Sequence, residues 1–101
     1  MGHLYVYVVG LQMRIQLAKF GQILISRPSG HEALLAMKAY FAPGTSDEVI
    51  ELDFTGVGVV APSWLDEVLS GLSSEYGRAR IRIVPSTNIS LIESLKALEW
   101  H

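Results

Sequence analysis

The stretch 53-DFTGVGVVAPSWLDEVLSGL-72 joins a buried strand to an amphipathic helix, and its pattern decides the fold. A tight turn follows the strand, and Pro62 and Ser63 stand where the helix begins. From Ser63 onward the apolar residues form a single stripe at about 3.6 residues per turn: Leu65, Val68, Leu69, Leu72 and Tyr76. Gly77 stands where a C-terminal cap is expected. The stretch therefore predicts a strand–turn–helix unit.

Upstream residues predict a second helix and the strand that leads into the stretch. Ser29-Gly-His-Glu32 reads as the capping box of a helix that runs through Phe41 and is stopped by Pro43-Gly44. Thr45–Asp47 is a polar loop. Glu48–Phe54 alternates as a half-buried strand does, with Ile50, Leu52 and Phe54 on one face and Glu51 and Asp53 on the other.

The N-terminal part predicts three short strands. They are Leu4–Val9, Arg14–Leu17 and Gln22–Ser26, with Gly10-Leu11 opening the first turn and Phe20-Gly21 the second. Strands joined by tight turns are expected to pair antiparallel. Leu4–Val9 is apolar and uncharged, so it must pair within its own sheet or with another copy, which makes a homodimer by edge pairing a further hypothesis.

The C-terminal part predicts one more strand and one more helix. Arg80–Val84 alternates and ends at Pro85, and the last helix starts at Asn88 or Ser90, with Ser90-Leu-Ile-Glu93 as its capping box. The buried side of this helix is expected to carry Leu91, Leu95 and Leu98. Arg78, Arg80 and Arg82 are expected to pair across the sheet with Glu51 and Asp53.

These elements predict one α/β domain with a mixed sheet. Strands separated by helices imply right-handed crossovers and parallel pairing in the later part of the chain. Charged residues that alternate along the later strands indicate that one sheet face is only partly covered. Most of the helical mass is therefore expected on the other face.

Composition excludes several classes of function. The chain of 101 residues has no cysteine, so disulfides and thiolate chemistry are excluded, and its net charge of −2 gives no electrostatic reason to bind nucleic acid. His3, His31 and His101 lack the spacing of metal ligands. No apolar run is long enough to cross a bilayer. We expect a cytoplasmic, soluble domain with no cofactor and no metal.

From about Met13 to Glu99, the chain resembles a STAS domain, the fold of sulfate transporters and anti-sigma-factor antagonists. It is closest to the small bacterial STAS-like domains of unknown function, so residues 13–101 are expected to form the domain and residues 1–12 an apolar N-terminal extension. The resemblance rests on Asp53-Phe-Thr-Gly-Val57, Val59-Val-Ala-Pro-Ser63 and Leu65. In anti-sigma-factor antagonists the residue matching Ser63 is phosphorylated by a partner kinase.

The match to that family also has departures. Ala61 replaces the turn aspartate, Pro62 the first serine and Trp64 the glycine, so a bulky ring follows the hydroxyl of Ser63. The resemblance implies a signalling module that binds a protein such as a histidine-kinase-type ATPase or an anti-sigma-type kinase. It does not identify the partner.

The junction at Ser63 therefore has two interpretations. Serine is a preferred N-cap, worth about 1 kcal/mol over alanine. A phosphate at the same oxygen would be favoured by the helix dipole and would add about −2 charge beside Asp66 and Glu67. The expected docking surface is Pro62, Ser63, Trp64, Asp66, Glu67 and Gly71.

Trp64 and Gly71 share a flank of this helix, off the apolar stripe. A glycine inside a helix costs up to about 1 kcal/mol, so something is expected to approach this flank closely. The first helix and a partner protein are the two alternatives, and Trp64 is accordingly either buried or an interface anchor.

An alternative function is a nucleotide or small-anion binder that uses helix N-termini. Arg27, Ser29 and Gly30 combine a cation with free backbone N–H groups before a helix, and Ser63 begins the other. No acid, base and nucleophile converge in any motif, so we expect no enzymatic activity.

Overall fold

The computed structural model describes residues 6–9, 12–40 and 48–100, and only the backbone of residues 6–9, 12 and 40. Its elements follow the order β1 (Val6–Val9), β2 (Gln12–Gln16), η1 (Leu17–Phe20), β3 (Ile23–Leu24), α1 (Arg27–Tyr40), β4 (Val49–Asp53), β5 (Val59–Val60), α2 (Pro62–Tyr76), η2 (Arg78–Arg80), β6 (Ile81–Ile83) and α3 (Ile89–Ala97). The predicted turn at Gly10-Leu11, helix stop at Pro43-Gly44 and loop Thr45–Asp47 lie outside the described residues, as do His3 and His101.

Four strands form the main sheet in the order β1-β2-β4-β6. β4 lies between β2 and β6 and is parallel to both, as expected for strands joined through helices. The prediction of antiparallel N-terminal strands holds only for β1 and β2. It is wrong for β3. The chain leaves the main sheet after β2 and the η1 turn, and β3 then pairs in parallel with β5 in a second sheet. The rest of the fold is therefore built from parallel pairs.

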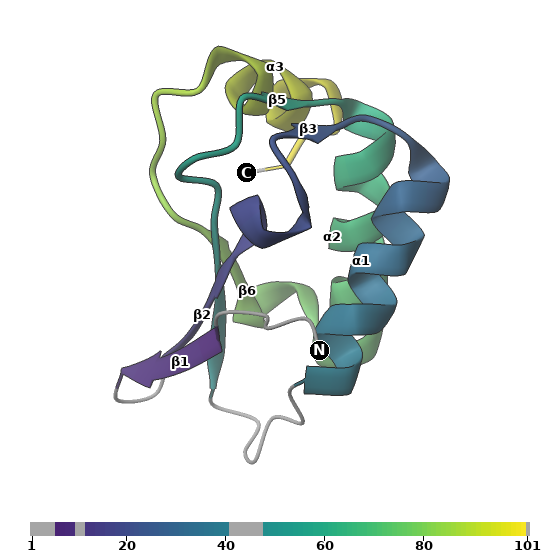
Figure 1. The fold of residues 1–101 in the computed structure, drawn as a ribbon. Coiled ribbons are helices and arrows are strands. Elements are labelled where there is room, and N and C mark those ends of the chain that lie inside the picture. Colours follow the sequence, from purple (N-terminus) through teal and green to yellow (C-terminus); the bar gives the residue numbers. More distant parts are fainter. Residues whose placement is uncertain (1–5, 10–11, 41–47, 101) are drawn as a thin grey trace.

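β3 and β5 form a separate two-stranded sheet, and β5 is a strand that the sequence pattern did not predict. The Val59 N–H donates to the Gln22 oxygen at 3.0 Å, and the Ala61 N–H donates to the Leu24 oxygen at 2.8 Å. Because this pair is parallel and each strand leads directly into a helix, the starts of α1 and α2 lie side by side (Figure 1).

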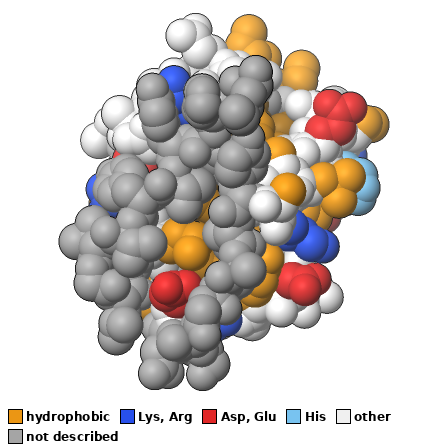
Figure 2. Space-filling view, turned by 60° about the horizontal axis from the view of Figure 1, so that its bottom comes forward, with side chains coloured by type: hydrophobic (Ala, Val, Ile, Leu, Met, Phe, Trp, Pro, Cys, Tyr) orange, Lys and Arg blue, Asp and Glu red, His pale blue; other side chains and the backbone are white. Residues whose placement is uncertain are grey.

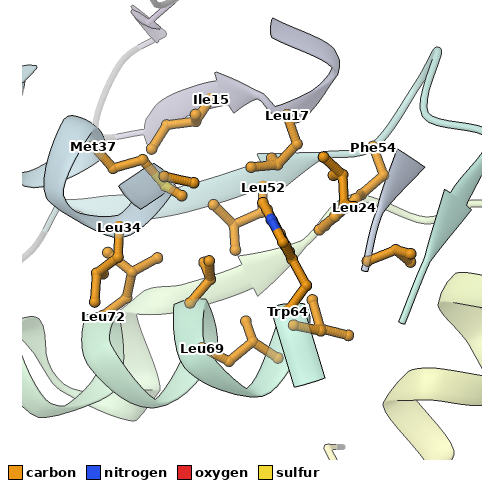
Figure 3. Close-up of a cluster of buried hydrophobic side chains, with 14 of the residues drawn as sticks. Ile15, Leu17, Leu24, Leu34, Met37, Leu52, Phe54, Trp64, Leu69 and Leu72 are labelled. Carbon is orange, nitrogen blue, oxygen red and sulfur yellow. The ribbon is translucent and has the colours of Figure 1, made fainter. Parts of the chain in front are cut away.

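Helices α1 and α2 run next to each other along one face of the main sheet, whereas α3 lies beside β5 (Figure 1). The core between helices and sheet is apolar (Figure 3): it includes Ile15, Leu17, Leu24, Leu34, Met37, Leu52, Phe54, Trp64, Leu69 and Leu72. The predicted stripe of α2 is confirmed, since Leu65, Val68, Leu69 and Leu72 are buried and Tyr76 packs against the core. Burial of these side chains, at about 25 cal/mol per Å² of apolar surface, is the main force that holds the helices to the sheet.

The other face of the main sheet carries charged side chains. Glu51 and Asp53 extend from β4 on the side opposite Ile50 and Leu52, as the alternation predicts. The main partner of Glu51 is Arg14 on β2, whose Nε and Nη2 lie 3.0 and 2.9 Å from Glu51 Oε1. These residues form an ion-pair network along the sheet.

The arginines near β6 differ in what they contact. Arg82 Nη1 lies 3.8 Å from Glu51 Oε2, as predicted. Arg78 instead stacks on the ring of Trp100, with its guanidinium carbon 3.5 Å from the ring centroid. Arg80 Nε donates to the Glu48 carbonyl oxygen at 2.8 Å. Arg78 and Arg80 belong to the η2 turn rather than to the strand, so the prediction that all three pair with Glu51 and Asp53 is wrong for these two.

The predicted capping boxes of two helices need correction. Helix α1 begins at Arg27, and the Ser29 N–H donates to the Ser26 hydroxyl at 3.2 Å, so Ser26 and not Ser29 caps this helix. At α3 the cap is Asn88, whose side chain accepts a hydrogen bond from the Leu91 N–H. Asn88 was one of the two predicted starts, and the capping box at Ser90 does not form.

Across the described ranges, no helix is both long and apolar enough to pass through a lipid bilayer.

Candidate functional site

Ser63 lies on the surface in the first turn of α2, directly after β5. The N-cap of α2 is Ala61, which makes no side-chain cap, and Pro62 takes the first helical position. Ser63 is therefore the second helical residue, and the prediction that it caps the helix is wrong. Pro62 and Ser63 are both exposed. The hydroxyl of Ser63 is available to another molecule at the positive end of the helix dipole.

Trp64 points in the opposite direction, into the core. Its side chain is fully buried, and its ring meets that of Phe54 edge-on at a centroid distance of 6.4 Å (Figure 3). Its indole N–H has no hydrogen-bond partner among the described residues. Trp64 is therefore a core residue and not an interface anchor, and its ring does not stand beside the Ser63 hydroxyl.

Gly71 is also covered from within the chain. A Cβ at this position would overlap the side chain of Leu34 on α1, so the close approach inferred from Gly71 is made by the first helix. Gly30 on α1 plays the reciprocal part, because a Cβ there would lie 2.8 Å from the Trp64 carbonyl oxygen. The flank of α2 that carries Trp64 and Gly71 is thus removed from the docking surface.

A charged cluster joins the first two turns of α1 to the first two turns of α2. Arg27 Nη1 lies 3.0 Å from Asp66 Oδ2 and 3.2 Å from Glu67 Oε1. His31 Nδ1 lies 3.0 Å from Glu67 Oε2. Hydrogen bonds from Arg27, and secondly from His31, hold the pKa of Glu67 below its ordinary value. The hydrogen bonds that Arg27 donates to Asp66 and then to Glu67 raise the pKa of Arg27.

This cluster changes the interpretation of the predicted anion site. Arg27 is bonded to two carboxylates, the Ser29 N–H donates to Ser26, and the Gly30 N–H donates to the Ser26 carbonyl. The three residues predicted to hold an anion therefore have protein partners. Asp66 and Glu67 are partly exposed, so of the predicted docking residues Pro62, Ser63, Asp66 and Glu67 remain on the surface.

An apolar strip adjoins this site on the outer face of the small sheet. Ile23 is 67% exposed and Ile25 53% on β3 and its extension, and Val59 on β5 is 45% exposed. Ile23 and Val59 are paired directly across the two strands. The strip leads through Ala61 to Pro62 and Ser63. Sequence reasoning missed it because a two-residue strand gives no periodic signal that marks its outward side.

A cleft of about 660 Å³ opens at the carboxyl ends of β4 and β6. Its walls are the turn Phe54–Val57 and the segment Pro85–Asn88, and both segments consist of uncharged residues. Asn88 joins the walls, since its Nδ2 donates to the Val57 oxygen at 2.8 Å and to the Gly58 oxygen at 3.2 Å. Ligands of open α/β sheets bind at such carboxyl ends. The signal in the sequence was two turn-like segments, each following a parallel strand.

The described surface carries charged side chains of both signs but no cluster of metal ligands. In the view of Figure 2, acidic and basic side chains are interspersed outside the area that the undescribed residues cover. No group of three His, Asp or Glu side chains in the described ranges is placed to hold a metal ion.

The architecture defines a small α/β domain with a mixed main sheet, a parallel two-stranded sheet, three α-helices in the described ranges, and an exposed hydroxyl at a strand–helix junction. The family model of the STAS-like domain of unknown function (DUF4325) matches residues 39–89, which include β4, β5, α2 and β6. The chain belongs to this family of STAS-like domains. No curated protein and no solved structure matches it.

Proposed function

We propose that this domain is a non-enzymatic regulatory module that binds a protein partner at the start of α2, and that phosphorylation of Ser63 controls the binding. The observation that carries the proposal is the exposed Ser63 hydroxyl in the first turn of α2, beside the apolar strip of Ile23, Ile25 and Val59. A partner protein could pack on this apolar strip next to Ser63. A phosphate on the Ser63 hydroxyl would place negative charge beside that contact and weaken it.

The charged cluster of Arg27, Asp66 and Glu67 would rearrange when Ser63 is phosphorylated. Asp66 and Glu67 lie three and four positions after Ser63, one turn along the same side of α2, and Arg27 contacts both of them. A phosphate on Ser63 would repel these two carboxylates and compete with them for Arg27, because charge-assisted bonds between arginine and phosphate are strong. Phosphorylation would therefore change both the charge and the side-chain arrangement of the docking surface.

The proposed modifying enzyme is an ATPase of the histidine-kinase type, as the STAS resemblance implies. In the reaction, the Ser63 hydroxyl oxygen would form a bond to the γ-phosphorus of ATP while the bond to the departing ADP breaks. The hydroxyl proton would pass to a base of the kinase. The domain contributes only an accessible acceptor at a helix N-terminus.

The test is to incubate the domain with ATP and a purified ATPase of the histidine-kinase type, and to locate phosphate by mass spectrometry. We expect phosphate on Ser63 and none on a Ser63→Ala variant. Ser63→Asp should weaken kinase binding, whereas Ser74→Asp, which adds the same charge at an exposed site near the other end of α2, should not. An unmodified Ser63, together with unchanged binding by Ser63→Asp, contradicts the proposal.

A second candidate function is the binding of a nucleotide or another small anion. It is favoured by the cleft between Phe54–Val57 and Pro85–Asn88, which is lined by the hydroxyl residues Thr55, Ser86 and Thr87 and reaches Asn88 at the start of α3. Thermal-shift measurements with nucleotides and phosphate test it, because a specific ligand raises the melting temperature as its concentration rises. A melting temperature that does not respond to any of these ligands contradicts this function.

A further inference from the structure

The two edges of the β3–β5 sheet differ in whether their outward backbone groups are hydrogen-bonded. At the edge formed by β5, helix α3 replaces a third strand: the Val60 N–H donates to the Ser90 hydroxyl at 3.0 Å, and the Ser94 hydroxyl donates to the Val60 oxygen at 3.0 Å. Both polar backbone groups of Val60 are therefore satisfied. This edge is closed to any other chain.

The edge formed by β3 is open. The carbonyl oxygens of Gln22 and Leu24 accept hydrogen bonds from the N–H groups of Val59 on β5 and of Ala61 just after it. Alternate residues of a strand point their backbone groups to opposite sides. The N–H and C=O groups of Ile23 and Ile25 therefore point away from β5. No hydrogen bond within the described residues reaches these four groups, and both side chains are more than half exposed.

We infer that the open edge of β3 binds an extended segment of the partner protein, which adds to the small sheet as a third strand. Unpaired backbone donors and acceptors at an exposed edge are the recognition element of this binding mode, and alternate side chains give it specificity. The neighbours of the edge fix the chemistry of the segment: Ile23, Ile25 and Val59 form an uncharged apolar strip, so the segment should carry apolar side chains at alternate positions.

A partner segment fits this edge better than a second copy of the domain does. Each side of a stable dimer usually buries about 800 Å². Three partly exposed side chains and a strand of two residues supply only a small part of such an area. A short extended peptide needs no larger surface, because its main-chain hydrogen bonds contribute much of the affinity.

The position of the edge connects this inference with the proposed function, on which it rests. Parallel pairing of β3 and β5 brings the start of α1 beside the start of α2. A segment that runs along β3 past Ile25 therefore reaches Arg27 and the cluster next to Ser63. The segment lies across β3 from β5, so a phosphate on Ser63, which follows β5, would act on it through Arg27, for which the phosphate competes with Asp66 and Glu67.

The experiment uses a phage-displayed library of random peptides of about twelve residues, with the whole domain as bait. Selected peptides should carry apolar residues at alternate positions. Ile25→Pro removes an outward N–H that the β3–β5 pairing does not use, and Ile23→Lys places a charge at the edge. Each variant should weaken peptide binding at least about tenfold, whereas the control Ile89→Lys, at another exposed isoleucine, should not.

Amide hydrogen exchange gives a second measurement that does not depend on variants. In the free domain the amides of Ile23 and Ile25 should exchange fast, while those of Val59 and Ala61 are protected by their bonds to β3. Bound peptide should slow exchange at Ile23 and Ile25. Unchanged exchange there, or equal binding by Ile25→Pro, overturns the inference. Self-association that Ile25→Pro abolishes overturns the choice of a partner segment over a second copy.

The two proposals fail in distinguishable ways. If Ser63→Asp weakens binding of the kinase while Ile25→Pro and Ile23→Lys do not, the proposed function stands and the edge inference is wrong. If the edge variants abolish peptide binding but Ser63 is never phosphorylated, the inference about the edge stands without the phosphorylation switch.

Discussion

The backbone of Trp64 lies so close to Gly30 that a Cβ on residue 30 would come within 2.8 Å of the Trp64 carbonyl oxygen. This contact sets the spacing of α1 and α2 at their first turns. We predict that Gly30→Ala destabilises the domain by about 1–2 kcal/mol, because the strain of overpacking exceeds the gain of up to about 1 kcal/mol that alanine brings to a helix. Urea unfolding measures the difference.

The control for this prediction is Ser29→Ala, which changes the neighbouring exposed residue of the same turn. It should change the free energy of unfolding by no more than about 0.5 kcal/mol. If Gly30→Ala instead raised the stability, the two helices would not be in close contact at this point.

The second prediction concerns Asn88, which caps α3 and also holds the turn after β4. Asn88→Ala should cost about 2 kcal/mol, since it removes the cap to Leu91 and the two bonds to the carbonyls of Val57 and Gly58. Thermal unfolding measures the loss. Asn88→Ser keeps a capping oxygen but not the amide donors, so it should recover only part of the stability. Equal stability of Asn88→Ala and the wild type contradicts the role of Asn88 as a tether.

Much of the fold could be predicted because long elements carry their own periodicity. The alternation of Ile50 and Leu52 with Glu51 identified the faces of β4, and the stripe of α2 identified its buried side. The cap of α2 could also have been placed correctly, because proline is favoured at the first helical position. Pro62 there puts Ser63 inside the helix, as the structure has it.

Other features depend on contacts between elements and leave no local pattern. Trp64 lies off the apolar stripe of α2, yet it is buried, because α1 packs against the flank of α2 that carries it. The pairing of β3 with β5 is set by where the chain leaves the main sheet, and the two residues of β5 are too few for a periodic signal. The apolar strip and the open edge of β3 follow from that pairing, so they could not be predicted either.

A third prediction tests the ion pair on the far face of the sheet. Glu51 is 6% exposed, and Arg14 makes two bonds to one of its oxygens. Arg14→Met should destabilise the domain by about 1–3 kcal/mol, because a nearly buried carboxylate loses its main partner while Arg82 remains at 3.8 Å. Adding Glu51→Gln to Arg14→Met should recover part of this loss. If the double variant is no more stable than Arg14→Met, the pair is not coupled.

The last prediction concerns pH and the cluster at the start of the two helices. The pKa of Glu67 is lowered from 4.5 by hydrogen bonds from Arg27 first and His31 second. A carboxyl group with a lowered pKa in the folded state stabilises that state fully at pH values above its unfolded pKa. This contribution is lost as pH falls below 4.5 through the folded pKa.

Glu67→Gln removes that titration, so the stability advantage of the wild type over this variant should shrink as pH falls from about 6 to about 3. Urea unfolding at several pH values measures it. In an Arg27→Met background the same comparison should depend less on pH, because the donor with the largest effect on Glu67 is gone. Identical pH profiles of wild type and Glu67→Gln would mean that the Glu67 carboxylate makes no such hydrogen bonds in solution. Arg27 would then not be held by Glu67, and a phosphate on Ser63 could not compete with that contact.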